Sequence, residues 1–287
     1  MAEKKRFFYG WLILLTCILI MGLGYAPLVS CASLFTKPVT EDLGFTRSGY
    51  ALVSTIAALM MAFMSPFIGK IMSKPYMHKA LVVCMIGNCL AYYCYSFAST
   101  LPQFYVTAAC IGFFECGSTM IPVSVLITNW FRKKRGLVMS IAMVGSSIGG
   151  TILSPIIGNL IASQGWRFTY KAVGITRLVI LVPLVLLVVR RTPADMGTKA
   201  YGADEEGETG KARKTEREWN VSLKEVKKKP MFWCFVLGCT LISATAAVIT
   251  QIPASVMDAG YATTTAASIA SLYLFIAIPG KLVLGHI

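Results

Sequence analysis

The sequence has little charge and almost no histidine. Only 14% of its 287 residues are Asp, Glu, Lys or Arg, and 56% are hydrophobic, whereas a soluble globular domain carries roughly 25% charged residues. This composition excludes an ordinary water-soluble domain. The only histidines, His78 and His286, cannot assemble a histidine-based metal or catalytic cluster. GxSxG, HExxH and Walker-type motifs are also lacking, so we expect no enzyme, no metal site and no cofactor.

The sequence also lacks the cysteine spacing of a disulfide framework or a metal site. None of its nine cysteines forms a CxxC pair, and all lie inside apolar runs. Cysteine in such surroundings behaves as a small apolar residue. We therefore expect the cysteines to be packing residues.

Long apolar runs are abundant. Eight of them reach the roughly 18 residues that mark a membrane-spanning helix, and none shows the alternating pattern of barrel strands. The first run is too long for a cleaved signal peptide. The expected helical spans cover residues 8–35, 50–72, 80–98, 101–128, 137–162, 168–189, 231–256 and 264–287.

Basic residues between the spans indicate the orientation. The N-terminus, the loops after spans two and four, and the polar segment 190–230 hold 21 of the 27 Lys and Arg residues, against four on the opposite side. Because cytoplasmic loops carry the excess of Lys and Arg, we expect a multi-pass protein of the cytoplasmic (inner or plasma) membrane with a cytoplasmic N-terminus. The net charge of +14 is then a topology signal, and no nucleic-acid partner is expected.

The polar segment divides the spans unequally, six before it and two after. We expect a six-helix transmembrane bundle over 1–189, a cytoplasmic linker loop over 190–230, and the first two helices of an incomplete second bundle over 231–287. Within the linker, 202–218 is expected to be a flexible tether. Residues 221–229 are either a short amphipathic helix on the membrane surface or a solvated linker.

Several motifs occur in an order that resembles a known family. Tyr9-Gly10-Trp11 opens span one, Asn-Trp-Phe-Arg-Lys-Lys-Arg-Gly at 129–136 enters a glycine-rich span five, and Gly165-Trp166-Arg167 follows. This series resembles the oxalate/formate antiporter and monocarboxylate transporter branch of the major facilitator superfamily. The resemblance implies an all-α membrane protein, a major facilitator-type helical bundle, whose family fold has twelve spans in two six-helix halves. It implies a complete N-terminal half plus two helices of the C-terminal half, and hence a truncated product or fragment.

The family's gate motifs match only in part. Its loop between spans two and three usually begins Gly-x-x-x-Asp-Arg, whereas here Gly69 is followed by Ser73 and Lys74, without the carboxylate. The resemblance makes Gly69, Lys74 and Arg135 candidate gating residues. Gly145 and Gly149 form a small-xxx-small pattern that either lets one half slide on the other or packs statically. Proline is missing from the family's antiporter motif in span five, so antiport is not inferred.

Ionisable side chains inside spans are costly and are therefore functional candidates. Glu115 lies near the middle of span four with Thr119 on the same helical face. It is expected either to carry a proton or to be fixed for packing. Arg177 in span six is expected to pair with Glu115 or with a backbone carbonyl in preference to substrate. Asn88 in span three is expected to be a packing or interfacial residue.

Lys281 is the candidate substrate contact. It stands in Pro-Gly-Lys-Leu-x-x-Gly at 279–285, which is similar to the family's Gly-Arg/Lys-x-x-x-Gly segment, where the cation contacts a substrate carboxylate. Tyr273 lies on the same helical face. The alternative is a lysine that snorkels to the cytoplasmic interface. Tyr25 and Gln251, on helices that line the family's cavity, are weaker substrate candidates whose alternative is helix packing.

These observations predict a secondary active transporter, or a fragment of one. Its expected substrate is a small organic anion, a mono- or dicarboxylate, moved by alternating access with proton symport or anion exchange. The lipid bilayer is its other partner, and the protein is expected to be a monomer or to need further C-terminal helices. Two alternatives stay open: a truncated, non-transporting sensor or assembly partner, and an efflux carrier for hydrophobic drugs that has little need of Lys281.

Overall fold

The computed structural model describes residues 8–202 and 226–286. The predicted tether beyond residue 202 and the predicted surface helix up to residue 225 lie outside the described residues. In the described part, 7 helices are long and apolar enough to cross a membrane. One of them, α8 (Arg135–Val188), has 54 residues and a non-helical Gly165 with φ 79 and ψ 167. A single helix of that length would measure about 80 Å, so α8 comprises two antiparallel spans, and the predicted eight spans are present.

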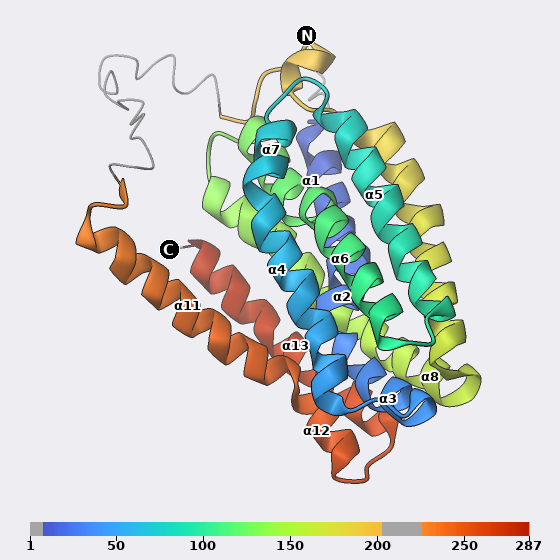
Figure 1. Cartoon of the computed structure of the whole chain (residues 1–287). Helices are drawn as coiled ribbons and strands as arrows, with labels where there is room; N and C mark the ends of the chain where they lie inside the picture. The colour runs from blue at the N-terminus through green and yellow to red at the C-terminus, as the bar shows by residue number, and fades with distance from the viewer. Residues whose placement is uncertain (1–7, 203–225, 287) are drawn as a thin grey trace.

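Successive spans of the first bundle run in opposite directions (Figure 1). Span one comprises α1 (Gly10–Leu19), the π-helix η1 (Ile20–Tyr25) and α2 (Ala26–Val29), and it continues through η2 (Ala32–Phe35) into α3 (Thr36–Leu43). The following spans are α4 (Arg47–Met72), α5 (Met77–Cys94) with η3 (Tyr95–Phe97), α6 (Leu101–Ser118) with α7 (Met120–Trp130), and α8. After η4 (Pro193–Met196) and the undescribed segment come α11 (Pro230–Thr250), α12 (Ile252–Asp258) and α13 (Thr263–His286).

Three spans predicted to be continuous are interrupted, and prolines account for the positions. Pro27 removes the N–H that would bond the Leu23 carbonyl, next to the π-helical turn of span one. The Pro122 ring would clash with the carbonyl four residues earlier in a regular helix. Accordingly, α6 ends at Ser118, and Thr119 has non-helical angles, φ −125 and ψ −94. Pro253 similarly follows the junction of α11 and α12.

The first segment of α8, residues 135–164, lies between span one and α13 (Figure 1). On one side, a Cβ placed on Gly149 would collide with the backbone of Gly22. On the other side, Gly150 approaches Leu274 and Gly158 approaches Ala267. Small residues on two faces of this segment thus let it pack closely against span one on one side and against α13 on the other.

The beginning of the linker is anchored to the first bundle. Trp130 Nε1 donates a hydrogen bond to the Arg190 carbonyl at 2.9 Å, and Asn129 Nδ2 donates to the Arg191 carbonyl at 3.1 Å. The Tyr201 N–H returns a bond to the Trp130 carbonyl at 3.0 Å. The Asn-Trp motif that carries the family resemblance therefore holds residues 190–201 against the end of span four.

Candidate functional site

A buried polar chain joins spans one, three, four and six. Glu115, Arg177 and Asn88 are 5%, 1% and 0% exposed, respectively. Arg177 Nη2 donates to the Gly24 carbonyl in η1 at 2.9 Å and also donates to Asn88 Oδ1. Asn88 Nδ2 in turn donates to Glu115 Oε2 at 2.8 Å. Arg177 thus has a backbone carbonyl partner and reaches Glu115 through Asn88, a residue the sequence indicated only for packing.

Thr119 completes this chain at the break in span four. Its Oγ1 lies 3.0 Å from Glu115 Oε1 and 3.0 Å from the Glu115 main-chain carbonyl oxygen. Both carboxylate oxygens of Glu115 therefore have a polar partner. On the far side of the guanidinium, the Tyr92 ring centroid lies 5.0 Å from Arg177 Cζ, within cation–π range.

Lys281 extends across to span five. Its Nζ donates to Ser146 Oγ at 2.8 Å and to the Met143 carbonyl at 3.2 Å. The side chain therefore does not snorkel towards the end of its helix. Two helical turns earlier, the Tyr273 hydroxyl is buried without a hydrogen-bond partner in the part of the chain that the structure describes. A buried hydroxyl normally has a partner, so this position has capacity for a polar ligand or a water molecule.

The weaker substrate candidates lie apart from Lys281. Tyr25 is half-buried at the end of η1, in the same π-helical turn as Gly24. Gln251 is exposed at the junction of α11 and α12. Among residues 8–202 and 226–286, no hydrogen bond joins either side chain to Lys281.

The predicted gating residues do not form one cluster. Arg135 is exposed and its Nε donates to the Phe131 carbonyl at 2.8 Å, within its own turn. Lys74 is exposed, and a Cβ on Gly69 would meet no atom within 4 Å. The loop that follows Gly69 is instead contacted by Arg191, whose Nη2 donates to the Ser73 carbonyl at 2.8 Å.

Gly145 and Gly149 contact span one. A Cβ on Gly145 would lie 2.9 Å from Ile18 Cα, and one on Gly149 would collide with Gly22. The sequence left open whether Gly145 and Gly149 let one half slide on the other or pack statically. In the structure the pair lies against span one of the same bundle and not against the last two spans. The physical reason is the helical period: Gly150 and Gly158, not this pair, are on the face towards α13.

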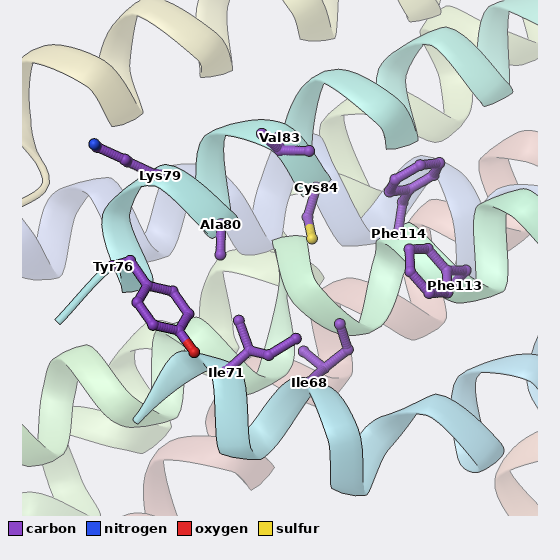
Figure 2. A pocket seen from close by; sticks show the side chains of 9 residues that line it. All are labelled: Ile68, Ile71, Tyr76, Lys79, Ala80, Val83, Cys84, Phe113 and Phe114. Carbon is purple, nitrogen blue, oxygen red and sulfur yellow. The ribbon is translucent and has the colours of Figure 1, made fainter. Parts of the chain in front are cut away.

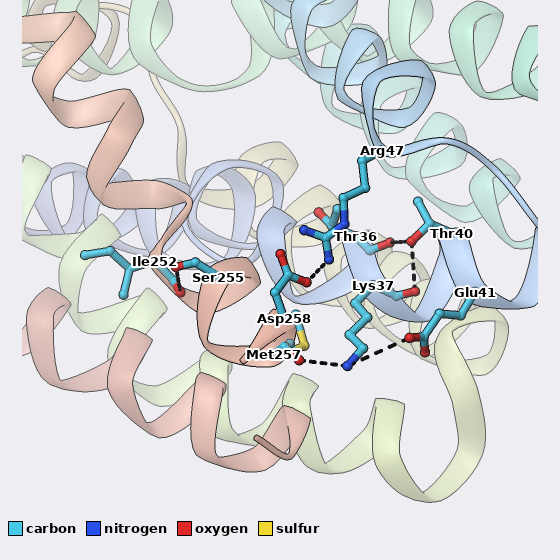
Figure 3. Close-up of polar contacts among 9 residues, drawn as sticks. All are labelled: Thr36, Lys37, Thr40, Glu41, Arg47, Ile252, Ser255, Met257 and Asp258. Atoms are coloured by element: carbon cyan, nitrogen blue, oxygen red, sulfur yellow. Dashed lines mark hydrogen bonds and ion pairs between the residues drawn. The ribbon is translucent and has the colours of Figure 1, made fainter. Parts of the chain in front are cut away.

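At the end of the molecule opposite Trp130, polar contacts tie the first bundle to α12 (Figure 3). Arg47, at the start of α4, forms an ion pair with Asp258 at the end of α12. Lys37 Nζ in α3 donates to the Met257 carbonyl at 2.7 Å and lies 3.8 Å from Glu41 Oε1. Figure 1 shows α11 leaning away from the first bundle towards its Pro230 end. The contacts of Lys37 and Arg47 therefore tie α12 to the first bundle at this end of the molecule.

An apolar groove of about 340 Å³ lies between α4, α5 and α6 (Figure 2). It contains none of the candidate site residues, and Lys79 is the one ionisable side chain with a formal charge among those lining it. Such a surface offers little to orient an anion. Its lining residues are Ile68, Ile71, Tyr76, Lys79, Ala80, Val83, Cys84, Phe113 and Phe114.

The fold and these buried charges define a multi-pass, all-α integral membrane protein of the transporter class. Residues 12–287 match the family model described as Major Facilitator Superfamily. The chain belongs to this superfamily. It is 24% identical over 229 residues to Monocarboxylate transporter 2 of Homo sapiens, covering 78% of this chain and 45% of that protein. Its relatives are transporters, not enzymes.

Other relatives and a solved structure agree with this assignment. The chain is 26% identical over 170 residues to Monocarboxylate transporter 4 of Gallus gallus, covering 58% of the chain and 35% of that protein. It thus spans less than half the length of these curated relatives. A bacterial homolog of the human lysosomal transporter Spinster, in an inward-facing and unoccupied conformation, has the same fold: TM-score 0.75, 17% identity, 97% of this chain and 62% of that chain.

Proposed function

We propose that the chain forms all or part of a secondary active transporter for a small organic anion, a mono- or dicarboxylate. The observation that carries this proposal is Lys281, a cation inside a span whose partners are two neutral oxygens, Ser146 Oγ and the Met143 carbonyl. Intramembrane cations are rare and mark substrate or ion pathways. A carboxylate is a stronger partner for an ammonium group than a neutral oxygen. The monocarboxylate transporters among the relatives support the same substrate class.

Tyr273 supplies a second contact to the anion in this proposal. Its unpartnered hydroxyl lies eight residues before Lys281, about 12 Å along the helix. An anion long enough to carry a second polar group towards Tyr273 can use this hydroxyl, whereas formate is too short to contact both residues. Tyr25 and Gln251 are assigned to the rest of the pathway because they lie at the interruptions of spans one and seven.

Glu115 is the proton carrier in this proposal. Its carboxyl group is the only buried acidic side chain among the described residues, and Arg177 balances its charge through Asn88. Proton symport is therefore favoured over anion exchange. Gly145 and Gly149 fix span one against span five, and Gly69, Lys74 and Arg135 act at the cytoplasmic end.

The contacts of Lys37 and Arg47 with α12 hold the outer end closed in this proposal. The basic loops support this orientation, with the N-terminus and the linker 190–230 in the cytoplasm. The linker separates the six-helix bundle of residues 1–189 from the helices of 231–287. The cytoplasmic membrane is the proposed location, and a monomer the proposed state.

Uptake of labelled lactate, pyruvate, oxalate and formate into proteoliposomes tests the proposal. We expect saturable uptake of at least one anion and its loss in Lys281→Gln. Lys171→Gln is the matched control, because Lys171 lies over the Phe97 ring, 5.0 Å from its centroid, and belongs to a different span from Lys281. Equal uptake by wild type and Lys281→Gln would refute substrate contact by Lys281. Absence of uptake of all four anions would refute the carboxylate assignment.

A non-transporting sensor is the second candidate, since an anion held by Lys281 and Tyr273 need not be moved across the membrane. It predicts that the 287-residue chain binds the anion saturably without flux. Calorimetry on the detergent-purified chain, run beside the uptake assay, separates the two functions.

A further inference from the structure

The hydrogen-bonding capacity of the buried chain assigns different roles to the two oxygens of Glu115. An arginine guanidinium can only donate hydrogen bonds, so the oxygen of the Asn88 amide must face Arg177. The amide nitrogen then faces Glu115 Oε2, at 2.8 Å. Since that nitrogen also only donates, Oε2 accepts this bond, and a proton placed on Oε2 would find no hydrogen-bond acceptor in the Asn88 amide nitrogen.

The other oxygen faces a group that can both donate and accept. Thr119 Oγ1 lies 3.0 Å from Glu115 Oε1 and 3.0 Å from the Glu115 main-chain carbonyl oxygen. When the carboxylate is ionised, the hydroxyl donates to Oε1. When Oε1 is protonated, the hydroxyl accepts that proton's hydrogen bond and donates its own hydrogen to the main-chain carbonyl. In both states the two carboxyl oxygens of Glu115 and the Thr119 hydroxyl have hydrogen-bond partners without movement of heavy atoms.

We propose that Glu115 takes up its proton on Oε1 and that Thr119 is the positioning residue which accepts the resulting O–H bond. Asn88 and Arg177 hold Oε2 as an acceptor in both states. The proton comes from a hydronium ion of the solvent: one O–H bond of hydronium breaks, the Oε1–H bond forms, a water molecule is released, and the carboxylate becomes a neutral carboxylic acid. This inference rests on the proposed function only in that Glu115 is the group that carries the proton.

Uptake of a proton leaves Arg177 as the charged member of the chain. The other titratable groups that face Glu115 are Tyr25 in span one, Cys89 in span three and Cys116 in span four. These groups are neutral in their ordinary protonation states, so none replaces the lost negative charge. Arg177 then retains only the Asn88 oxygen and the Gly24 carbonyl of η1 as acceptors. The proton therefore changes the balance of charge at the two places where spans one and four depart from regular helix.

Infrared difference spectroscopy on the purified chain in lipid nanodiscs tests the position of the proton. A pH titration should reveal the C=O band of a protonated carboxylic acid that disappears in Glu115→Gln. Thr119→Val should move this band to higher frequency, because the carboxyl O–H loses its acceptor, and Thr119→Ser should return it to the wild-type position. Ser118→Ala is the matched control, since the Ser118 hydroxyl contacts only the Glu115 main-chain carbonyl, at 3.3 Å.

Two results would overturn the proposal. One is a band that stays at the wild-type frequency in Thr119→Val, and the other is the absence of a Glu115 band at every pH at which wild type remains folded. If Thr119→Val does not fold, Thr119→Ala against Thr119→Ser provides the same comparison. The infrared test measures no transport. Its result is therefore independent of whether Lys281→Gln abolishes anion uptake, so failure of this proposal can be distinguished from failure of the proposed function.

Discussion

The contact between Gly149 in α8 and Gly22 in η1 provides a sharp test of the packing. A Cβ on Gly149 would lie 2.6 Å from the Gly22 carbonyl carbon and closer still to the neighbouring Cα and oxygen. All of these are backbone atoms, so no side-chain rotation relieves the collision. Gly69 in α4 is the matched control, because its added Cβ would meet no atom within 4 Å.

Gly149→Ala should therefore lower the free energy of unfolding, whereas Gly69→Ala should raise it. Carbon atoms in contact are normally about 3.5–4.0 Å apart, so Gly149→Ala must separate the two helices by about 1 Å. Overpacking of a core costs about 1–3 kcal/mol, and a backbone-to-backbone collision belongs at the upper end. Alanine returns about 1 kcal/mol of helix propensity, which leaves Gly149→Ala destabilised by about 2 kcal/mol. Gly69→Ala keeps only the gain, and should be up to about 1 kcal/mol more stable than wild type.

SDS titration in mixed micelles, followed by tryptophan fluorescence and circular dichroism, measures both free energies of unfolding against wild type. A difference of about 3 kcal/mol is a factor of roughly 100 in the unfolding equilibrium constant. Gly149→Ala that is as stable as Gly69→Ala would refute the reasoning, because it would mean that spans one and five do not touch at this glycine.

Three further predictions concern polar contacts. Arg177→Met should lower the free energy of unfolding by about 3–5 kcal/mol because it leaves a buried carboxylate without its counter-charge, and Arg177→Met with Glu115→Gln should recover part of this loss in a double-mutant cycle. In a double-mutant cycle with neutral replacements of Arg47 and Asp258, the coupling free energy should be below about 1 kcal/mol, because the pair is partly exposed. This coupling should decrease at high salt. A coupling that does not depend on salt would contradict the prediction. Trp130→Phe removes one hydrogen bond to the linker, worth about 1 kcal/mol, and should speed proteolysis at residues 190–201 in a time course followed by mass spectrometry.

The spans could be predicted from the sequence because the bilayer imposes length and apolarity on each one. The interruptions within spans were less accessible. Pro27, Pro122 and Pro253 are visible in the sequence, but proline is tolerated in membrane helices when neighbours satisfy the freed backbone groups. Whether a given proline breaks its span therefore depends on partners from other spans, and these are not local properties of the sequence.

The same limit applies to the candidate site. Glu115 and Arg177 stand out in the sequence because a charge inside a span is costly. Asn88 does not, because a neutral amide in an apolar run has the same pattern whether it packs or links two charges. Its function emerges only from the meeting of α5, α6 and α8, which places it between the two charged groups. Lys281 shows the converse: the sequence identified the residue, while its partner Ser146 comes from a different span.

The irregular backbone and the buried charges occupy the same places, and this coincidence has a physical basis. Arg177 donates to the Gly24 carbonyl within the π-helical turn, and Glu115 bonds Thr119 at the break between α6 and α7. In a regular membrane helix the backbone groups hydrogen-bond to one another, so few acceptors are free to bind a charged side chain in lipid. An interrupted helix exposes carbonyl groups at a depth where few other polar groups exist. Arg177 thus stabilises the irregular turn of span one through a backbone carbonyl, whereas the Thr119 hydroxyl holds Glu115 at the break of span four. If Glu115 carries the proton as proposed, its neutralisation changes the charge next to both bends, in spans one and four, and we propose that the proton biases the movement of the bundle through them.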